Sequence, residues 1–204
     1  VLLAAFIYKK NRYSKSIKFT IYCWIVGIIP ALLTLKVSSD LSSALVIMAI
    51  TFGLTFIFNR TKKMHIVVLL TAVGLIAGYI LHIKSNLPDP AHIDDYSYRI
   101  ARIVAWLYPD RYSDAAYQSQ TALYSIGSGG FWGVGLGRMY VNIPEGQTDF
   151  IFVLLTHQLG IFGGICLILC YVYLLFQILK IALNACSLYE TILVIGILIH
   201  IATQ

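Results

Sequence analysis

Four apolar segments of this chain are long enough to cross a lipid bilayer as helices. A spanning helix needs about 20 predominantly apolar residues. Runs near this length occupy residues 19–35, 41–58, 66–83 and 149–179, and the last is long enough to tilt or bend. Hydrophobic residues make up 59% of the chain and charged residues 12%, which leaves too little polar surface for a water-soluble globule. The sequence therefore predicts an all-α fold, a polytopic transmembrane helix bundle.

Shorter apolar runs lie at both ends, at residues 1–8 and 191–204, and the first residue is not Met. Each run is shorter than a span and is expected to be part of a further helix. We therefore expect residues 1–204 to form a single, partial membrane domain from the interior of a longer protein. The four cysteines have no CxxC spacing and lie within or beside apolar runs, so they predict neither a disulfide nor a metal site.

Basic residues are concentrated in two short segments, at residues 9–18 and 60–63. Lys and Arg mark the cytoplasmic loops of membrane proteins, so both segments are expected inside. Alternation of the spans then places residues 84–148 outside, as one large extracytoplasmic loop. This loop carries five Lys and Arg against six Asp and Glu, unlike a basic cytoplasmic domain. The net charge of +6 is thus a topology signal, and no nucleic-acid surface is expected.

The function of the chain is expected to lie in this loop, because about 65 residues far exceed a usual connection between helices. Residues 94–108 have helical spacing, which predicts an amphipathic helix that lies in the membrane interface and is ended by Pro109. Arg99 and Arg102 lie on this helix. They either extend their charges toward lipid headgroups or together hold a phosphate-bearing ligand.

The segment that begins at Ser125 is rich in glycine through Gly137 and is expected to be non-helical. Such a chain can turn sharply and bring its own amides to a ligand. No Lys-Ser/Thr pair follows the glycines and no strand precedes them, which excludes a Walker loop and a dinucleotide fingerprint. Irregular backbone at membrane depth must be buried in protein or line a wet cavity, so this segment is predicted to be re-entrant or a lid.

An acid, Asp149, stands at the start of the last long apolar run. In one interpretation, Thr148 caps the helix and Asp149 in its first turn complements the helix dipole. In the other, which we favour, the acid is functional, because ionisable residues are costly at a membrane boundary. Helical geometry puts Val153 and Thr156 on the same face and His157 about 80° around the helix, so a direct dyad between Asp149 and His157 is not expected.

Several short motifs resemble those of the SEDS proteins (FtsW, RodA and SpoVE), polytopic bacterial membrane proteins of about ten helices. The residues that carry the resemblance are Tyr98-Arg99 with Arg102 and Pro109, Tyr117-Gln118, Ile126-Gly127-Ser128-Gly129-Gly130, Gly135-Leu136-Gly137, Pro144-Glu145 and Thr148-Asp149-Phe150-Ile151-Phe152. They are similar, in order and spacing, to the family's YRxxR with its following proline, YQ, IGSGG, GLG, LPE and TDFIF. Helix order agrees over nearly the whole chain.

The chain also departs from the family pattern. His157 and Gln158 stand in place of two glutamates that follow TDFIF, and Thr121-Ala122 stand in place of a QS pair. Asp40 keeps the acid of the family's QPDLGTA stretch but lacks the flanking proline and glycine. These differences identify a divergent member and point to altered pairing or weakened activity.

The resemblance implies a peptidoglycan glycosyltransferase of the bacterial cytoplasmic membrane, acting in cell shape, division or sporulation beside a class B penicillin-binding protein. Its substrate would be lipid II, the undecaprenyl-pyrophosphate-linked disaccharide pentapeptide, and its reaction an inverting glycosyl transfer. Asp149 would act as the catalytic base, and Arg99 and Arg102 would neutralise the departing pyrophosphate, with a divalent cation such as Mg²⁺ or Mn²⁺ as a further candidate. The other expected substrate-binding residues are Tyr117, Gln118, Ser128, Gly129, Gly130, Glu145 and Thr148, with Asp40 as a secondary candidate.

Three alternatives stay open. A lipid II flippase would also need a wet cavity with intramembrane charge, which Asp40, Arg99 and Asp149 could line. A degenerate member could be a scaffold that only docks the transpeptidase partner, an interpretation that the substitutions at His157 and Gln158 favour. A polymer ligase of the O-antigen type shares the polytopic plan and the large outer loop, but the motif series speaks against it.

Overall fold

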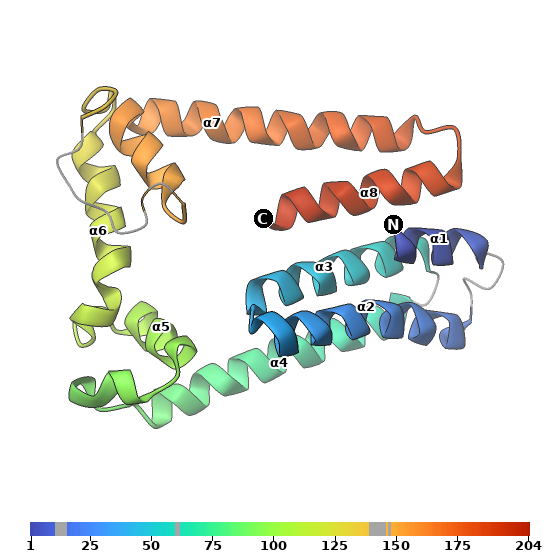
Figure 1. Cartoon of the computed structure of the whole chain (residues 1–204), viewed down its shortest axis with the longest axis horizontal. Coiled ribbons are helices and arrows are strands. Elements are labelled where there is room, and N and C mark those ends of the chain that lie inside the picture. The colour runs from blue at the N-terminus through green and yellow to red at the C-terminus, as the bar shows by residue number, and fades with distance from the viewer. Residues whose placement is uncertain (11–15, 60–61, 139–145, 147) are drawn as a thin grey trace. The chain divides into compact units, whose positions relative to one another are not determined.

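The structure, a computed structural model, describes residues 1–10, 16–59, 62–138, 146 and 148–204. Every regular element within these residues is a helix, which confirms the all-α prediction. In chain order the elements are α1 (Leu2–Lys9), α2 (Ile17–Ser38), α3 (Leu41–Phe58), α4 (Lys62–Ser85), the 3-10 helix η2 (Pro90–Asp95), α5 (Tyr98–Leu107), α6 (Ser113–Gly129), α7 (Ile151–Leu183) and α8 (Leu188–Thr203) (Figure 1).

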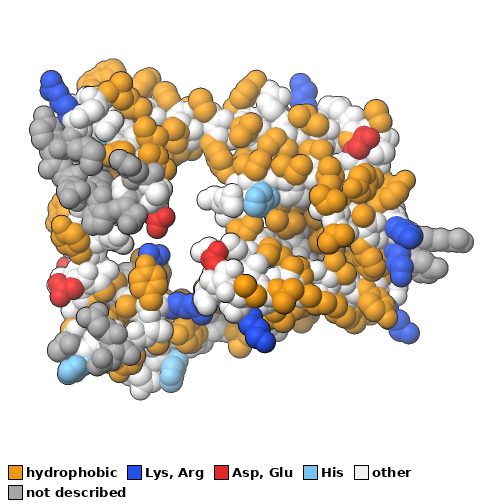
Figure 2. Space-filling model, viewed as in Figure 1, with side chains coloured by type: hydrophobic (Ala, Val, Ile, Leu, Met, Phe, Trp, Pro, Cys, Tyr) orange, Lys and Arg blue, Asp and Glu red, His pale blue; other side chains and the backbone are white. Residues whose placement is uncertain are grey.

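Four helices, α2, α3, α4 and α7, are long and apolar enough to cross a membrane, and α8 is a shorter apolar helix. Their side chains are mostly apolar and many are exposed, such as Leu70 and Leu75 on α4, which are 65% and 75% exposed. Figure 2 shows hydrophobic side chains spread widely over the visible face. Helices with apolar side chains on all sides are surrounded by lipid or by other membrane helices. The chain is a multi-pass membrane protein.

The chain forms two compact units, of which the first comprises residues 1–72 and 171–204. Within this unit α2 packs against α3, and α8 packs against α1 and α3. The close contact between α2 and α3 depends on Gly27, because a Cβ atom there would lie 2.1 Å from the Thr51 hydroxyl. A buried hydrogen bond from the Asn59 side chain to the Thr20 hydroxyl (3.2 Å) joins the other end of the pair.

The second unit, residues 73–170, contains most of the predicted outer loop. Its first part is a small helical cluster in which η2 and α6 both pack against α5. A hydrophobic core of Ile83, Ile93, Val104 and Tyr112 holds the cluster together. The buried Tyr112 hydroxyl donates a hydrogen bond to the Pro88 carbonyl (2.7 Å), which ties the start of α6 to the chain that follows α4.

The helix predicted over residues 94–108 is shorter than expected. η2 ends at Asp95, Ser97 has an extended backbone as the residue before α5, and α5 itself runs from Tyr98 to Leu107. Asp and Ser side chains compete with helical hydrogen bonding and favour helix starts and turns, which explains the late start. The helix ends as predicted, just before Pro109.

The prediction that the chain is non-helical from Ser125 is wrong for its first residues, because α6 continues through Gly129. Ser125 is fully buried and its hydroxyl donates to the Thr121 carbonyl (2.8 Å) within the helix. Packing of this helical turn against α7, described below, outweighs the low helix propensity of glycine. The irregular backbone begins only at Gly130, where φ is 61°.

Candidate functional site

The long helix α7 is broken at Gly160, whose backbone leaves the helical conformation (φ 75°, ψ 179°). The residues that follow α6, 130–137, form an irregular segment that we call the glycine loop. Four backbone hydrogen bonds join this loop to the break. The amides of Val134 and Gly135 donate to the carbonyls of His157 (3.1 Å) and Gln158 (3.1 Å). In return, the amides of Ile161 and Phe162 donate to the carbonyls of Gly130 (3.0 Å) and Phe131 (3.3 Å). Backbone groups within a membrane must be paired inside the protein, so the loop stabilises the break.

The contact between the loop and the break is close enough to require glycine on both sides. A Cβ atom on Gly133 would lie 2.1 Å from the Gln158 carbonyl oxygen, and one on Gly160 would lie 2.2 Å from the Phe131 carbonyl oxygen. Both residues also have positive φ angles, 78° and 75°, which L side chains rarely adopt. The glycine-rich segment thus serves close backbone packing against α7.

A buried histidine connects α6 to α7 just before the break. His157 is 1% exposed, and its Nδ1 atom lies 2.8 Å from the Ser125 carbonyl oxygen and 3.3 Å from the Ser128 hydroxyl. A carbonyl oxygen only accepts hydrogen bonds, so Nδ1 carries the hydrogen and donates. The Ser128 hydroxyl in turn donates to the Ser125 carbonyl (3.0 Å).

Small and apolar side chains complete this helix contact. A Cβ atom on Gly129 would lie 2.9 Å from the His157 carbonyl oxygen, and Ala122 clusters with Val153, Ile126 and Phe150. Since Ser125 meets His157 and Ala122 meets Val153, both helices advance in the same direction along the contact. Figure 1 shows α6 beside the first part of α7.

The capping interpretation expected Asp149 in the first turn of α7. In the structure Asp149 lies before the helix. Residues 148–150 form a turn, and the helix begins at Ile151. The half-buried Phe150 packs against the α6 contact cluster and fixes this entry to the helix, while Asp149 is exposed. Gln118 lies one helical turn before Ala122 on α6. Asp149 directly precedes Phe150, a residue of the same contact cluster.

A cavity of about 280 Å³ opens between α5 and α6. It is lined by Tyr98, Ala101, Arg102, Asp114, Ala115, Tyr117 and Gln118. The Arg102 guanidinium carbon lies 4.5 Å from the Tyr98 ring centroid, a cation–π arrangement that holds the side chain over the helix. The structure brings three predicted binding residues, Arg102, Tyr117 and Gln118, to one cavity.

The remaining predicted residues lie elsewhere. Arg99 is exposed and is not among the residues that line this cavity, so the two arginines do not form a pair there. Ser128, Gly129 and Gly130 belong to the contact with α7 rather than to the cavity wall. Thr148 lies in the turn beside Asp149. Glu145 lies outside the described residues.

The predicted divalent cation has no cluster of ligands in the described part of the chain, where no group of three or more His, Cys, Asp or Glu side chains could hold a metal. The cation stays a prediction.

Asp40, the secondary candidate, caps α3 in the other unit. Its carboxylate accepts hydrogen bonds from the amides of Ser42 (2.9 Å) and Ser43 (3.3 Å) and from the Ser43 hydroxyl. These bonds, the one from the Ser43 hydroxyl above all, hold the pKa of Asp40 below its ordinary value. The acid is therefore engaged in a helix cap in this structure.

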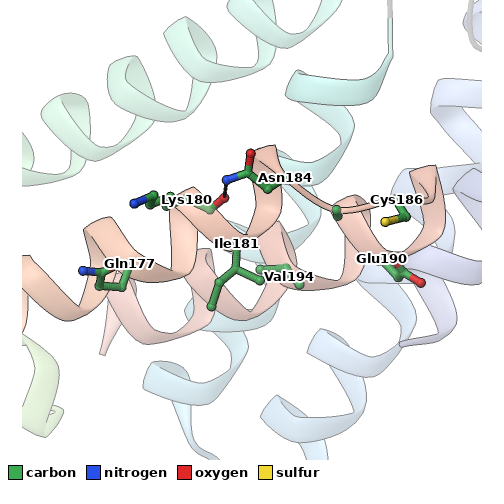
Figure 3. A pocket seen from close by; sticks show the side chains of 8 residues that line it. Gln177, Lys180, Ile181, Asn184, Cys186, Glu190 and Val194 are labelled. Atoms are coloured by element: carbon green, nitrogen blue, oxygen red, sulfur yellow. Dashed lines mark hydrogen bonds between the residues drawn. The ribbon is translucent and has the colours of Figure 1, made fainter.

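A wider cavity of about 640 Å³ lies between the end of α7 and the start of α8, within the first unit (Figure 3). Its polar lining residues are Gln177, Lys180, Asn184, Cys186 and Glu190. The Asn184 amide is engaged with the Lys180 carbonyl (2.9 Å), and Glu190 belongs to the capping box of α8. Asn184 and Glu190 thus serve the two helix ends, and the dashed line in Figure 3 marks the bond of Asn184.

Sequence reasoning missed two features of the site. His157 was considered as a partner of Asp149 and as a lost family position but not as a contact of α6, although a polar residue within an apolar run indicates a partner on another helix. Asp114 was not considered, although it lies one helical turn before Gln118 in a helical segment, which places both on one face. Its inclusion makes the cavity wall of mixed charge, with Arg102 on α5 and Asp114 on α6.

Comparison with known proteins agrees with this arrangement of helices and motifs. The model of the FtsW/RodA/SpoVE family, described as cell cycle proteins, matches residues 1–204. The chain belongs to this family. The FtsW/RodA/SpoVE match covers the candidate spans as well as residues 84–148, so the SEDS resemblance of the motifs is confirmed.

Individual relatives of this SEDS chain carry related names. Stage V sporulation protein E of Bacillus subtilis is 40% identical over 52% of the chain and 30% of that relative. A probable peptidoglycan glycosyltransferase FtsW of Coxiella burnetii is 31% identical over 99% of the chain and 53% of that relative. A protein of the same name from Tolumonas auensis is 31% identical over 72% of the chain and 36% of that relative. The matched part spans between about a third and a half of these relatives.

Proposed function

We propose that this SEDS chain is part of a peptidoglycan glycosyltransferase that polymerises lipid II by inverting glycosyl transfer. The observation that carries the proposal is a cavity that presents Arg102, Tyr117 and Gln118 on α5 and α6, while Phe150, the neighbour of Asp149, packs on α6. The names of the FtsW relatives support the same reaction class.

In this mechanism the cavity holds the anionic end of the donor. The Arg102 guanidinium offers planar, charge-assisted hydrogen bonds that suit phosphate oxygens. Tyr117 and Gln118 offer hydroxyl and amide groups for the sugar or phosphate. Asp114 on the same wall repels a second anion and favours binding of the phosphate at the Arg102 side.

Asp149 supplies the base. Its carboxylate accepts the proton of the 4-hydroxyl group of the acceptor GlcNAc, and the hydroxyl oxygen bonds to the anomeric carbon of the donor MurNAc. The bond from this carbon to the phosphate oxygen breaks, and undecaprenyl pyrophosphate leaves with the electron pair. Arg102 stabilises the charge that develops on this leaving group. Attack from the face opposite the leaving group inverts the anomeric configuration.

The location follows from the substrate. We place the chain in the bacterial cytoplasmic membrane with the basic segments inside and residues 84–148 outside, where lipid II sugars are polymerised. A class B penicillin-binding protein is the expected partner, because a transpeptidase must cross-link the glycan strands that this reaction produces.

The decisive experiment measures glycan-chain formation from purified lipid II by the full-length protein with its transpeptidase partner. Wild type is compared with Asp149→Asn and with Asp110→Asn, an exposed acid of the same unit that does not line the cavity. We expect chains from wild type and Asp110→Asn and none from Asp149→Asn, with equal lipid II binding by all three proteins.

Other outcomes identify other functions. Formation of glycan chains by Asp149→Asn would show that another residue acts as the base. A wild type that binds the transpeptidase but forms no chains would be a scaffold. A wild type that forms no chains but moves lipid II across vesicle membranes would be a flippase.

A further inference from the structure

His157 connects three segments that are separate in the sequence. Its side chain donates from Nδ1 to the Ser125 carbonyl on α6 (2.8 Å), and its own carbonyl accepts from the Val134 amide of the glycine loop (3.1 Å). Its backbone also lies against Gly129, where a Cβ atom would be only 3.0 Å from the His157 Cα atom. One buried residue before the break thus meets both α6 and the loop.

The remaining contacts between the helical parts of α6 and α7 carry no directional side-chain bond. Ala122, Val153 and Ile126 meet through apolar surfaces, Gly129 brings the two backbones close, and the backbone hydrogen bonds of the glycine loop lie beyond the end of α6. Apolar and small residues let two membrane helices approach closely through dispersion contacts, which have no preferred direction. A hydrogen bond depends on distance and angle, so the bond from His157 to Ser125 defines one position.

The register determines where the two parts of the candidate site meet. The cavity residues Tyr117 and Gln118 lie about two turns before Ser125 on α6, and Asp149 lies about two turns before His157 along α7 and the turn that precedes it. A slide at the contact of Ser125 with His157 would be transmitted along both helices. It would move Asp149 relative to the cavity by the same amount.

We propose that His157 is a positioning residue that fixes the register of α6 against α7 and thereby the position of Asp149 relative to the cavity of Arg102, Tyr117 and Gln118. The effect of this register on catalysis rests on the proposed glycosyltransferase function. The register itself does not depend on that function, so the register and the function can be tested separately.

The variants separate the hydrogen bond from the volume of the side chain. His157→Asn places an amide nitrogen near the position of Nδ1 and can donate to Ser125. His157→Gln keeps a comparable volume but carries its amide one bond further, near the position of Nε2. Gln158→Asn is the matched control, because Gln158 accepts a hydrogen bond from the glycine loop through its backbone carbonyl, which the substitution keeps.

The first measurement is oxidative cross-linking of Ala122→Cys with Val153→Cys, two positions of one buried cluster. It uses the full-length protein with Cys23, Cys166, Cys170 and Cys186 replaced by alanine. We expect His157→Gln to slow cross-linking by about tenfold, and His157→Asn and Gln158→Asn to leave it near the wild-type rate. Equal rates in all four proteins would overturn the proposal.

The second measurement is lipid II polymerisation by the same His157 and Gln158 variants without the added cysteines. We expect His157→Gln to lower kcat by about tenfold with little change in KM, because the binding cavity on α5 and α6 is intact, and His157→Asn to restore kcat. A lower yield of folded protein with unchanged kcat per folded molecule would mean a purely structural role and would refute positioning. If wild type forms no polymer, the proposed function fails, and cross-linking still decides whether His157 sets the register.

Discussion

The guanidinium carbon of Arg102 lies 4.5 Å from the centre of the Tyr98 ring, one helical turn earlier on α5. The aromatic face attracts the cation and limits its rotamers, so less conformational freedom is lost when Arg102 binds an anion. Arg99, on the same helix, is exposed away from the cavity lining. The two arginines of one motif therefore have different surroundings.

We predict that Arg102→Ala raises the KM for lipid II by about 10- to 100-fold, the equivalent of one charge-assisted hydrogen bond of roughly 1.5–3 kcal/mol. Arg102→Lys should recover only part of this loss, because an ammonium group lacks the planar fork. Arg99→Ala should change KM less than threefold, a limit set by the weak screened attraction of an exposed charge. Initial rates of polymerisation at varied lipid II concentration give these values. An equal effect of both alanine variants would contradict the assignment.

A second prediction concerns the break in α7. Gly160→Ala puts a methyl group 2.2 Å from the Phe131 carbonyl oxygen at a φ of 75°. Backbone strain at such an angle costs about 1–3 kcal/mol, and the displaced loop adds to this cost. We expect a loss of at least about 3 kcal/mol of stability or failure to fold.

Gly127→Ala is the matched control, since within the described residues no atom other than those of adjacent residues and of the helix's own backbone lies within 4 Å of a Cβ atom there. This position lies inside α6, so alanine should be neutral or stabilise the helix by about 0.5–1 kcal/mol. Thermal unfolding of the purified proteins in detergent compares the two. A Gly160→Ala protein as stable as Gly127→Ala would show that the loop is not docked on the break.

The Tyr112 hydroxyl provides a third prediction. Tyr112→Phe removes the donor to the Pro88 carbonyl in a buried setting and should cost about 1 kcal/mol. The loss should be local, so amide exchange should accelerate around residues 88–112 more than in α2 and α3. Tyr124→Phe, at a position that is 74% exposed, should leave exchange unchanged. Hydrogen exchange followed by mass spectrometry measures both variants.

The fourth prediction concerns pH and Asp40. Hydrogen bonds from Ser43 lower the pKa of this carboxyl below its ordinary 3.8. A lowered pKa in the folded state means that the cap stabilises the fold above the ordinary pKa and loses this effect as pH falls through the lowered value. The Tm difference between wild type and Asp40→Ala should thus be constant from neutral pH to about 4 and shrink below it. Asp40→Asn keeps an acceptor without the charge and should show a smaller, pH-independent difference.

The helices of this chain were largely predictable because their signals are local. An apolar run of span length needs no knowledge of neighbours to be read as a helix, and the amphipathic spacing before Pro109 identified most of α5. The motif order likewise placed Arg102, Tyr117 and Gln118 among the candidate binding residues. Their convergence on one cavity follows from the packing of α6 on α5, which the motif positions alone do not specify.

The break at Gly160 was not predictable, because residues that are distant in sequence stabilise it. Single glycines are common in membrane helices and do not by themselves indicate a break. The partners come from Gly130, Phe131, Val134 and Gly135, and only the folded chain brings them to α7. The same reason explains the misplaced start of the irregular segment, since contact with His157 keeps Ser125–Gly129 helical.

The order of the broken helix and its partner in the chain has a consequence for biogenesis. The ribosome makes the glycine loop before it makes Gly160, so the amides and carbonyls that the broken span requires already exist when the span is inserted. Loop and first half-helix can therefore leave the translocon as a paired unit, and no exposed peptide group has to wait in lipid for a later segment. A circular permutation that placed residues 130–137 after α7 would reverse this order and is expected to lower membrane insertion without changing any residue of the contact.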